Sequence, residues 1–128
     1  MARNHRVFIA FPIEDERTRD LLVGQMRNNN SPFKWTDLSV KEPWTEQWRE
    51  QCLTRIKGCD GMIAIVSSNT AKAAGQLYEM RMAREVGIPL VGIYASQQNR
   101  PSSLPAEFRD VRVLDWTWPN ISSFLSRL

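Results

Sequence analysis

Histidine and cysteine are scarce in this chain, and their scarcity excludes several kinds of active site. The 128 residues include one histidine, His5, and two cysteines, Cys52 and Cys59, which are seven positions apart. This spacing forms neither a CxxC redox motif nor a zinc knuckle, so we expect both thiols to be reduced and buried. A Ser-His-Asp or Cys-His system would have to use His5, and no G-x-S-x-G turn is present. The sequence therefore predicts chemistry without histidine and without a metal ion.

Long apolar runs and blocks of like charge are absent as well. No run approaches the ~20 apolar residues that a membrane span requires, and the first residues lack the hydrophobic segment of a signal peptide. The chain carries 17 Lys and Arg against 14 Asp and Glu, a net charge of +3, without a block of five like charges. Neither a P-loop nor a G-x-G-x-x-G motif occurs. We therefore expect a cytoplasmic protein that binds neither membranes nor nucleic acid.

What the chain does have is an alternation of short apolar segments with amphipathic ones. Its length suits a single domain, which we expect to span residues 1–128. The apolar segments predict strands over residues 6–11, 33–36, 61–67, 90–94 and 111–115. The amphipathic segments predict helices over residues 15–27, 45–57, 73–86 and 119–128, with Thr45 as an N-cap. The pattern favours an α/β class, a three-layer flavodoxin-like fold with a five-stranded parallel sheet in the order 2-1-3-4-5.

Individual helices are expected to bury particular side chains. In the first, Leu21, Leu22 and Met26 are predicted to face the core. In the second, Trp48, Cys52 and Ile56 recur at i, i+4 and i+8.

In such a sheet, ligands bind beyond the carboxyl ends of the strands, at the switch point between strands one and three. This rule selects residues 11–15, 37–44 and 67–70. Each segment also has a plainer interpretation: the acidic residues after Phe11 interact favourably with a helix N-terminus, Asp37 and Ser39 form a turn, and Asn69 caps the following helix. Trp44, at the end of the loop, is equally suited to cover a planar ligand.

Glu79 lies on the unexpected face of its predicted helix. At about 100° per residue, Arg81, Arg84 and Glu85 share an arc that must face solvent, and Glu79 projects almost opposite its centre. A buried carboxylate is costly unless it is paired or used. The periodicity alone leaves two alternatives open, a structural salt bridge or hydrogen bond and a carboxylate that lines the ligand crevice.

Four segments of the chain resemble bacterial TIR-like domains, the MTH538-type TIR-like family that includes the TIR proteins of Thoeris anti-phage systems. They lie between residues 6 and 94 and read RVFIAF, LLVGQMRNNNSPFKWTDLSVKEPW, GMIAIVSSNT and YEMRMAREVGIPLVGIY. The second segment is long and fairly specific, whereas the residues after 94 add little to the resemblance.

The resemblance implies a TIR-type flavodoxin-like fold and, as in active members of the family, cleavage of NAD+ at the nicotinamide–ribose bond. The family's catalytic glutamate lies on the helix after the third strand, and Glu79 matches it. NAD+ is then the substrate, and no cofactor or metal is implied. The crevice loops that the resemblance assigns to substrate binding contain Phe11, Asp37, Ser39, Lys41, Trp44, Ser67, Asn69 and Thr70.

This sequence departs from the family pattern beside the glutamate. Better-known TIR enzymes carry a Trp-Cys pair where this chain has Gly75 and Gln76. Its first loop reads Phe-Pro-Ile-Glu-Asp in place of the more usual version with serine or aspartate. We therefore expect the details of ribose binding to differ from those of the better-known enzymes.

The resemblance further implies an ADP-ribose-type signal, linear or cyclic, made in anti-phage defence. It implies a homo-oligomer on activation and a separate effector protein that senses the product. Two alternatives remain. One is a non-catalytic TIR-like interaction module, in which Glu79 is structural. The other is a nucleoside deoxyribosyltransferase-like enzyme, which also uses a glutamate at an N-glycosidic bond.

Overall fold

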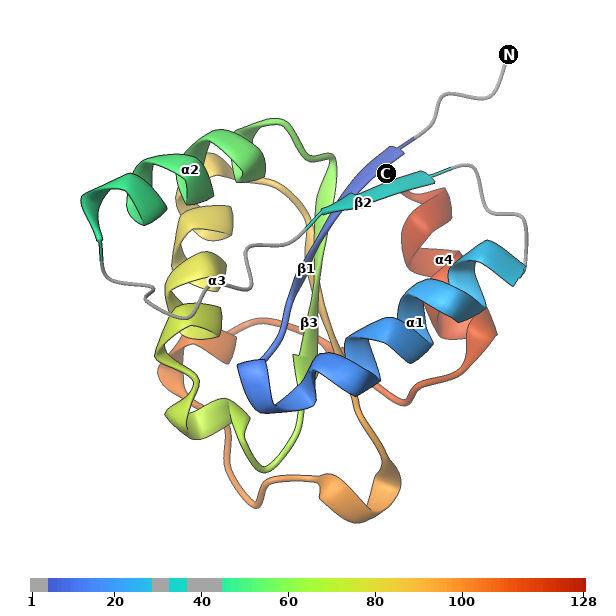
Figure 1. Ribbon diagram of the computed structural model, residues 1–128. Coiled ribbons are helices and arrows are strands. Elements are labelled where there is room, and N and C mark those ends of the chain that lie inside the picture. The colour runs from blue at the N-terminus through green and yellow to red at the C-terminus, as the bar shows by residue number, and fades with distance from the viewer. Residues whose placement is uncertain (1–4, 29–32, 37–44) are drawn as a thin grey trace.

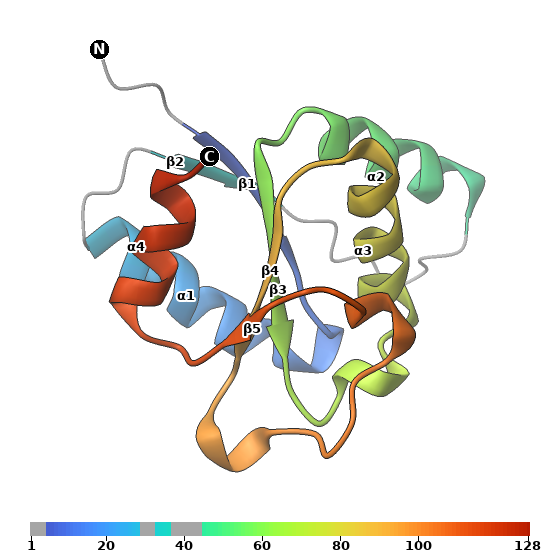
Figure 2. The same cartoon turned by 180° about the vertical axis from the view of Figure 1, so that it is seen from behind.

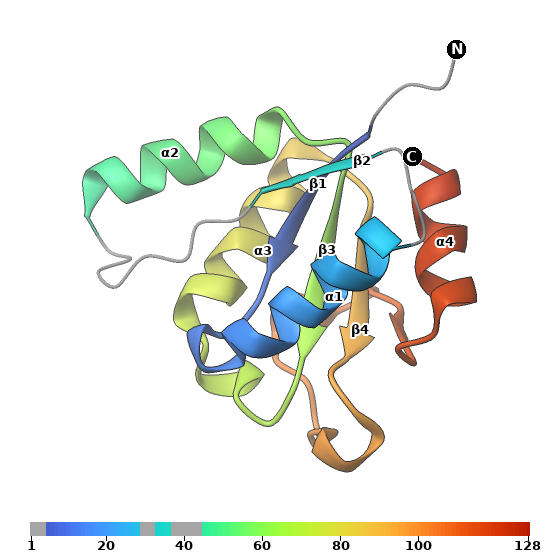
Figure 3. The same ribbon diagram turned by 45° about the vertical axis from the view of Figure 1, so that its right-hand side comes forward.

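A five-stranded parallel sheet with helices on both faces forms the protein (Figures 1 and 3). The computed structural model describes residues 5–28, 33–36 and 45–128. The strand order is β2-β1-β3-β4-β5, and every pair is parallel. The predicted flavodoxin-like architecture and its strand order are thereby confirmed.

The strands are β1 (His5–Ala10), β2 (Phe33–Thr36), β3 (Gly61–Val66), β4 (Leu90–Tyr94) and β5 (Val113–Leu114). The α-helices are α1 (Glu16–Asn28), α2 (Glu46–Lys57), α3 (Ala74–Val86) and α4 (Trp118–Ser126). Four short 3-10 helices complete the described elements: η1 (Ile13–Asp15), η2 (Thr70–Lys72), η3 (Gln97–Asn99) and η4 (Ala106–Phe108).

Successive side chains of the central strands point to opposite faces of the sheet, so the core has two layers. In β1, Val7 and Ile9 face the layer under α1 and α4, whereas Phe8 and Ala10 face the layer under α2 and α3. All six residues of β3 are buried, because helices cover both faces of this central strand. Figure 2 shows from behind how α3 and α4 stand on opposite sides of β4.

Two predictions about these elements are wrong. Leu21 is 64% exposed, because the buried face of α1 runs instead through Leu22, Val23 and Met26. The fifth strand is limited to Val113–Leu114 rather than residues 111–115. Residues 108–111, just before this strand, form a turn, because the Val111 amide donates to the Phe108 carbonyl at 2.9 Å. The three side chains predicted to be buried on α2 are buried, as are both free cysteines.

None of the helices in the described ranges is both long enough and apolar enough to cross a membrane.

The N-cap of α2 provides a test of the local structure. The Thr45 hydroxyl accepts a hydrogen bond from the Trp48 amide at 3.1 Å, so Thr45→Ala should lower the free energy of unfolding by about 1 kcal/mol. Urea denaturation measures the loss. Thr54→Ala, at an exposed position inside the same helix, is the matched control and should change stability by less than about 0.5 kcal/mol. Equal losses in the two variants would contradict the capping role.

Candidate active site

The inward face of α3 brings a carboxylate toward the sheet. The buried residues of this helix are Gln76, Glu79, Met80 and Ala83, and Glu79 is only 5% exposed. Arg81 and Arg84 lie on the opposite, exposed side, as the periodicity predicts. The helix begins after the carboxyl end of β3, so Glu79 is held within two turns of that sheet edge. Its location agrees with the sequence analysis, and its catalytic role remains a prediction.

The solvent-facing arginines of α3 hold the connection between β4 and β5. Arg81 forms an ion pair with Glu107 at 3.2 Å, and Arg84 donates to the Arg109 carbonyl. The exposed side of α3 is therefore anchored to a second segment of chain, which fixes the rotation of the helix and keeps Glu79 inward.

Glu79 also affects a thiol of the neighbouring helix. Burial first, and then the negative charge of Glu79, raise the pKa of Cys52 to about 12 from its ordinary 9.0. The negative charge of Glu79 thus opposes a second negative charge on the neighbouring helix. The Cys52 thiol stays protonated at neutral pH, and we assign it no nucleophilic role.

A buried hydrogen-bond network joins the first and third loops of the sheet's carboxyl edge. Ser67 Oγ donates to Asp15 Oδ2, and Asn69 Nδ2 donates to Asp15 Oδ1 at 3.0 Å. The Asn69 amide in turn donates to Ser67 Oγ at 3.0 Å. Asp15 is 8% exposed and Ser67 is fully buried. Asp15 therefore fixes the loop that leads from β3 toward the helix of Glu79.

Two further hydrogen bonds hold the same loop, one within it and one to η3. The Ser67 amide donates to Thr70 Oγ1 at 3.0 Å, and Thr70 is fully buried. The Ser68 amide donates to Asn99 Oδ1 at 2.9 Å, which ties the loop to η3. Because Ser67 and Thr70 are enclosed, they shape the loop from within, whereas Asn69 is partly exposed.

Gln76 bridges the two strands at the switch point. Its Nε2 donates to the Ala10 carbonyl at 3.0 Å and to the Ile65 carbonyl at 2.6 Å, near the carboxyl ends of β1 and β3. Its side chain is 2% exposed, and its Oε1 has no hydrogen-bond partner among the described residues. The amide therefore ties both strands to α3 one turn before Glu79.

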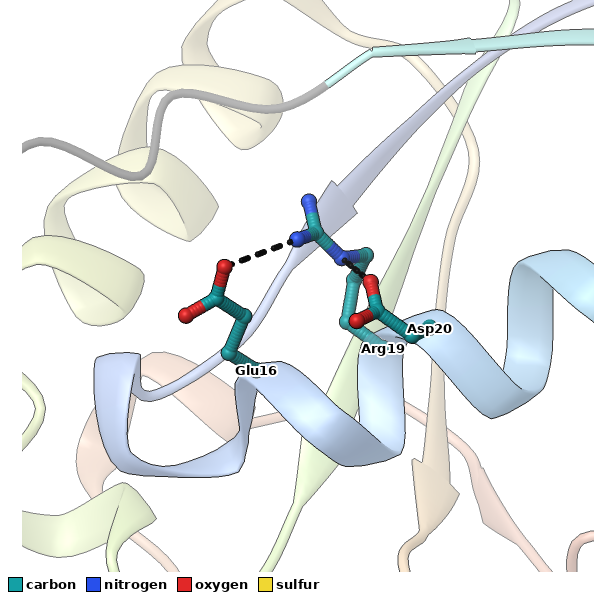
Figure 4. Close-up of polar contacts among 3 residues, drawn as sticks. All are labelled: Glu16, Arg19 and Asp20. Atoms are coloured by element: carbon teal, nitrogen blue, oxygen red, sulfur yellow. Dashed lines mark hydrogen bonds and ion pairs between the residues drawn. The ribbon is translucent and has the colours of Figure 1, made fainter.

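Phe11 lies at the start of the first loop and contacts a buried arginine. The Arg19 guanidinium is 5.0 Å from the Phe11 ring centroid and 5.3 Å from that of Trp35. Figure 4 shows two carboxylates of the same helix that pair with Arg19, Glu16 at 3.3 Å and Asp20 at 2.7 Å. This arginine stacks on the ring of a predicted binding residue while its charge is balanced locally.

A hollow of about 310 Å³ opens at the carboxyl ends of β4 and β5. Arg100 lies on one wall, 4.4 Å from the Tyr94 ring centroid and paired with Asp115. Trp116 forms another part of the lining and donates to Gln25 of α1 at 2.6 Å. The carboxyl edge of the sheet therefore offers open space beside the hydrogen-bonded loops.

The structure brings part of the predicted site together. Phe11, Ser67, Asn69 and Thr70 lie at the carboxyl edge, and Glu79 lies on the helix that follows. The other four predicted binding residues, Asp37, Ser39, Lys41 and Trp44, lie outside the described residues. No group of three His, Cys, Asp or Glu suited to a metal ion occurs in the ranges that the structure describes.

Sequence reasoning did not find the contacts of three polar residues of this region, Asp15, Arg19 and Gln76. The sequence places Asp15 in a predicted ligand-binding segment and among several acidic residues at a helix N-terminus, and it presents Gln76 only as a departure from a family pattern. Gln76 could have been found on the helical wheel, because it precedes Glu79 by three residues and shares its buried face. Nothing in the sequence distinguishes Asp15 from Glu14 and Glu16, since only the chain's path brings Ser67 to it.

The double hydrogen bond of Gln76 predicts a stability loss. Gln76→Leu keeps the side chain's approximate size but leaves the Ala10 carbonyl without this donor. We expect the free energy of unfolding to fall by about 1–3 kcal/mol, the cost of an unsatisfied buried group. Chemical denaturation measures it, with Gln51→Leu on the exposed side of α2 as control. A loss no larger than that of the control would contradict the bridging role.

The buried thiols predict a loss of stability at alkaline pH. Burial raises the pKa of Cys52 to about 12 and that of Cys59 to about 11, whereas an ordinary thiol titrates near 9. Above about pH 9 the unfolded chain releases these protons and the folded chain retains them, so stability falls as the pH rises toward 11. Denaturation across this range should show a shallower fall for the Cys52→Ala/Cys59→Ala variant. Parallel curves would contradict the assignment.

Comparison with known proteins identifies the fold. No protein-family model matches the sequence, and no curated protein matches it significantly. The TIR domain of the Toll-related receptor TRR-2 from Hydra magnipapillata superimposes with a TM-score of 0.64 at 16% identity, covering 97% of this chain and 94% of that one. The TIR domains of the activated Roq1 resistosome, which directly recognises the pathogen effector XopQ, give 0.52 at 17% identity, covering 73% of this chain and 57% of that one. The chain therefore has the fold of a TIR domain.

Proposed function

We propose that this protein is a TIR-like enzyme that cleaves NAD+ at the nicotinamide–ribose bond. The observation that carries the proposal is the location of Glu79, a carboxylate buried on the inward face of the helix after β3 in a chain with a TIR fold. This is the helix on which the family that the sequence resembles carries its catalytic glutamate.

One carboxylate suffices for this chemistry. Ordinary glycosidases use two, because their leaving alkoxide must be protonated. The nicotinamide of NAD+ is already cationic, so the C–N bond breaks with its electron pair going to the ring nitrogen, and the base leaves as a neutral molecule. The positive charge that develops on the ribose is stabilised by Glu79, whose low-dielectric surroundings strengthen the interaction. Water then adds to the ribose carbon and releases a proton, which gives ADP-ribose.

The surrounding groups have complementary roles in the proposal. Phe11 and Asn69 contact the substrate from the first and third loops, together with Asp37, Ser39, Lys41 and Trp44, which lie outside the described residues. Ser67 and Thr70 are fully buried and hold the third loop in place. Capture of the ribose by an atom of the same molecule, in place of water, gives a cyclic product.

A signalling role in anti-phage defence follows from the resemblance to Thoeris TIR proteins. We propose that the product is sensed by a separate effector protein and that the active form is a homo-oligomer. The Roq1 TIR domains, which share the fold, occur in an activated resistosome, and this supports an assembled active state.

Nicotinamide release tests the catalytic role of Glu79. Glu79→Gln keeps the size of the side chain but removes the charge, and we expect the rate to fall about 100-fold or more. Glu85→Gln, on the exposed side of the same helix, should keep the wild-type rate. Mass spectrometry of NAD+ incubated with each folded variant, at low concentration and under conditions that promote assembly, measures nicotinamide and the ribose product.

Two outcomes would overturn the proposal. Equal release by wild type and a folded Glu79→Gln variant would remove Glu79 from the mechanism. Absence of release by assembled wild-type protein would favour the non-catalytic interaction module, in which Glu79 serves the packing of α3.

A further inference from the structure

A second hollow lies at the opposite, amino end of the sheet, between the start of β4, β5 and the end of α4. We call it the β4–α4 hollow. Its volume is about 350 Å³, at the lower end of the range for small-molecule sites, ~300–1,000 Å³. Its apolar lining comes from Leu90, Val91, Leu114, Phe124 and Leu128. None of these residues belongs to the candidate active site.

The short fifth strand creates this hollow. β5 pairs only with Gly92 and Ile93 of β4. Within the described part of the chain, Leu90 and Val91 therefore have β3 on one side and no strand on the other. The wall opposite is the end of α4, which approaches β3 closely because residue 61 is glycine. A Cβ there would come within 2.6 Å of Leu128 Cδ2. The short β5 therefore leaves the hollow open beside Leu90 and Val91, and the close approach of α4 to β3 forms its opposite wall.

The rim of the hollow is cationic. Arg112 and Arg127 both line it, and Asp110 is the acidic residue that the described lining contains. The Arg127 guanidinium donates to the Ser123 carbonyl at 3.2 Å. Within the ranges that the structure describes, neither arginine forms an ion pair with a carboxylate. Two guanidinium groups beside an apolar floor are suited to an anion attached to an apolar body, since guanidinium binds a carboxylate through two parallel hydrogen bonds.

We propose that the β4–α4 hollow binds a small amphiphile with one carboxylate and a short apolar body. The apolar part lies against Leu90, Leu114 and Leu128, and the carboxylate contacts Arg112 and Arg127. Bound there, the ligand contacts both the start of β4 and the end of α4. The site is independent of the function proposed for Glu79, because it lies at the other end of the strands.

Octanoate is the probe for this site, with 1-octanol and octylamine as matched neutral and cationic molecules. Calorimetry on the full chain, below the micelle concentration, should give saturable binding of octanoate at one site. Octanol should bind about 100-fold more weakly, because it loses the charge-assisted contacts with both arginines, and octylamine should not bind. In an amide NMR spectrum, the octanoate-induced shifts should gather on residues 90–91, 112–114 and 124–128.

Substitutions assign the contacts. Arg112→Gln and Arg127→Gln should each weaken octanoate about tenfold and leave the affinity for octanol unchanged. Arg109 is an exposed arginine in the connection between β4 and β5 and lies outside the hollow's lining. The Arg109→Gln variant should therefore bind octanoate as the wild type does. Leu90→Phe fills the hollow, keeps both arginines and should abolish binding; a thermal unfolding scan verifies that it is folded. Glu79→Gln should bind octanoate normally, which separates this proposal from the enzymatic one.

Three results would overturn the proposal. Octanol that binds as tightly as octanoate would show that the arginines contribute nothing. Unchanged octanoate affinity in both Arg112→Gln and Arg127→Gln would do the same. Shifts spread over the whole surface without saturation would show that octanoate has no site in the hollow.

Discussion

The carbonyl of Ile65, near the end of β3, is the point on which both the fold and the candidate site depend. It accepts from Gln76 Nε2 at 2.6 Å and from Thr70 Oγ1 at 3.4 Å. The same Gln76 amide reaches the Ala10 carbonyl of β1. Two strands, a 3-10 helix and α3 thus meet through buried polar groups, which are worth most when all are satisfied and cost most when one is lost. Any shift of α3 relative to the sheet has to break these bonds.

The candidate site concentrates polar groups that the rest of the core avoids. The buried polar and charged residues among those described are Asp15, Arg19, Ser67, Thr70, Gln76 and Glu79. All six come from the two loops that follow β1 and β3 and from the helices that those loops lead into. Burying such groups is costly without partners. Their concentration beyond the carboxyl ends of β1 and β3 is typical of a functional site.

The two ends of the sheet carry different chemistry. The carboxyl end has an inward carboxylate and hydrogen-bonded loops, and the proposed function places the reacting ribose there. The amino end has arginines over an apolar floor, suited to an anion. Both arrangements arise from the parallel sheet, because the loops at its carboxyl end lead into helices, whereas the helix ends and strand starts gather at the other. The arginines of α3 that bind Glu107 and the Arg109 carbonyl connect the helix of Glu79 with the segment before β5.

The sequence by itself determined the alternation of strands and helices, the parallel sheet and the position of Glu79 on the inward face of α3. These follow from local periodicity and from the rules that govern crossover connections, which operate without knowledge of distant residues. Tertiary structure decided the rest. The turn at residues 108–111 shortened β5, the packing of α1 exposed Leu21, and the chain's path brought Asp15 to Ser67 across 52 positions of sequence. Contacts between residues so far apart depend on how the elements pack, and no local pattern encodes them.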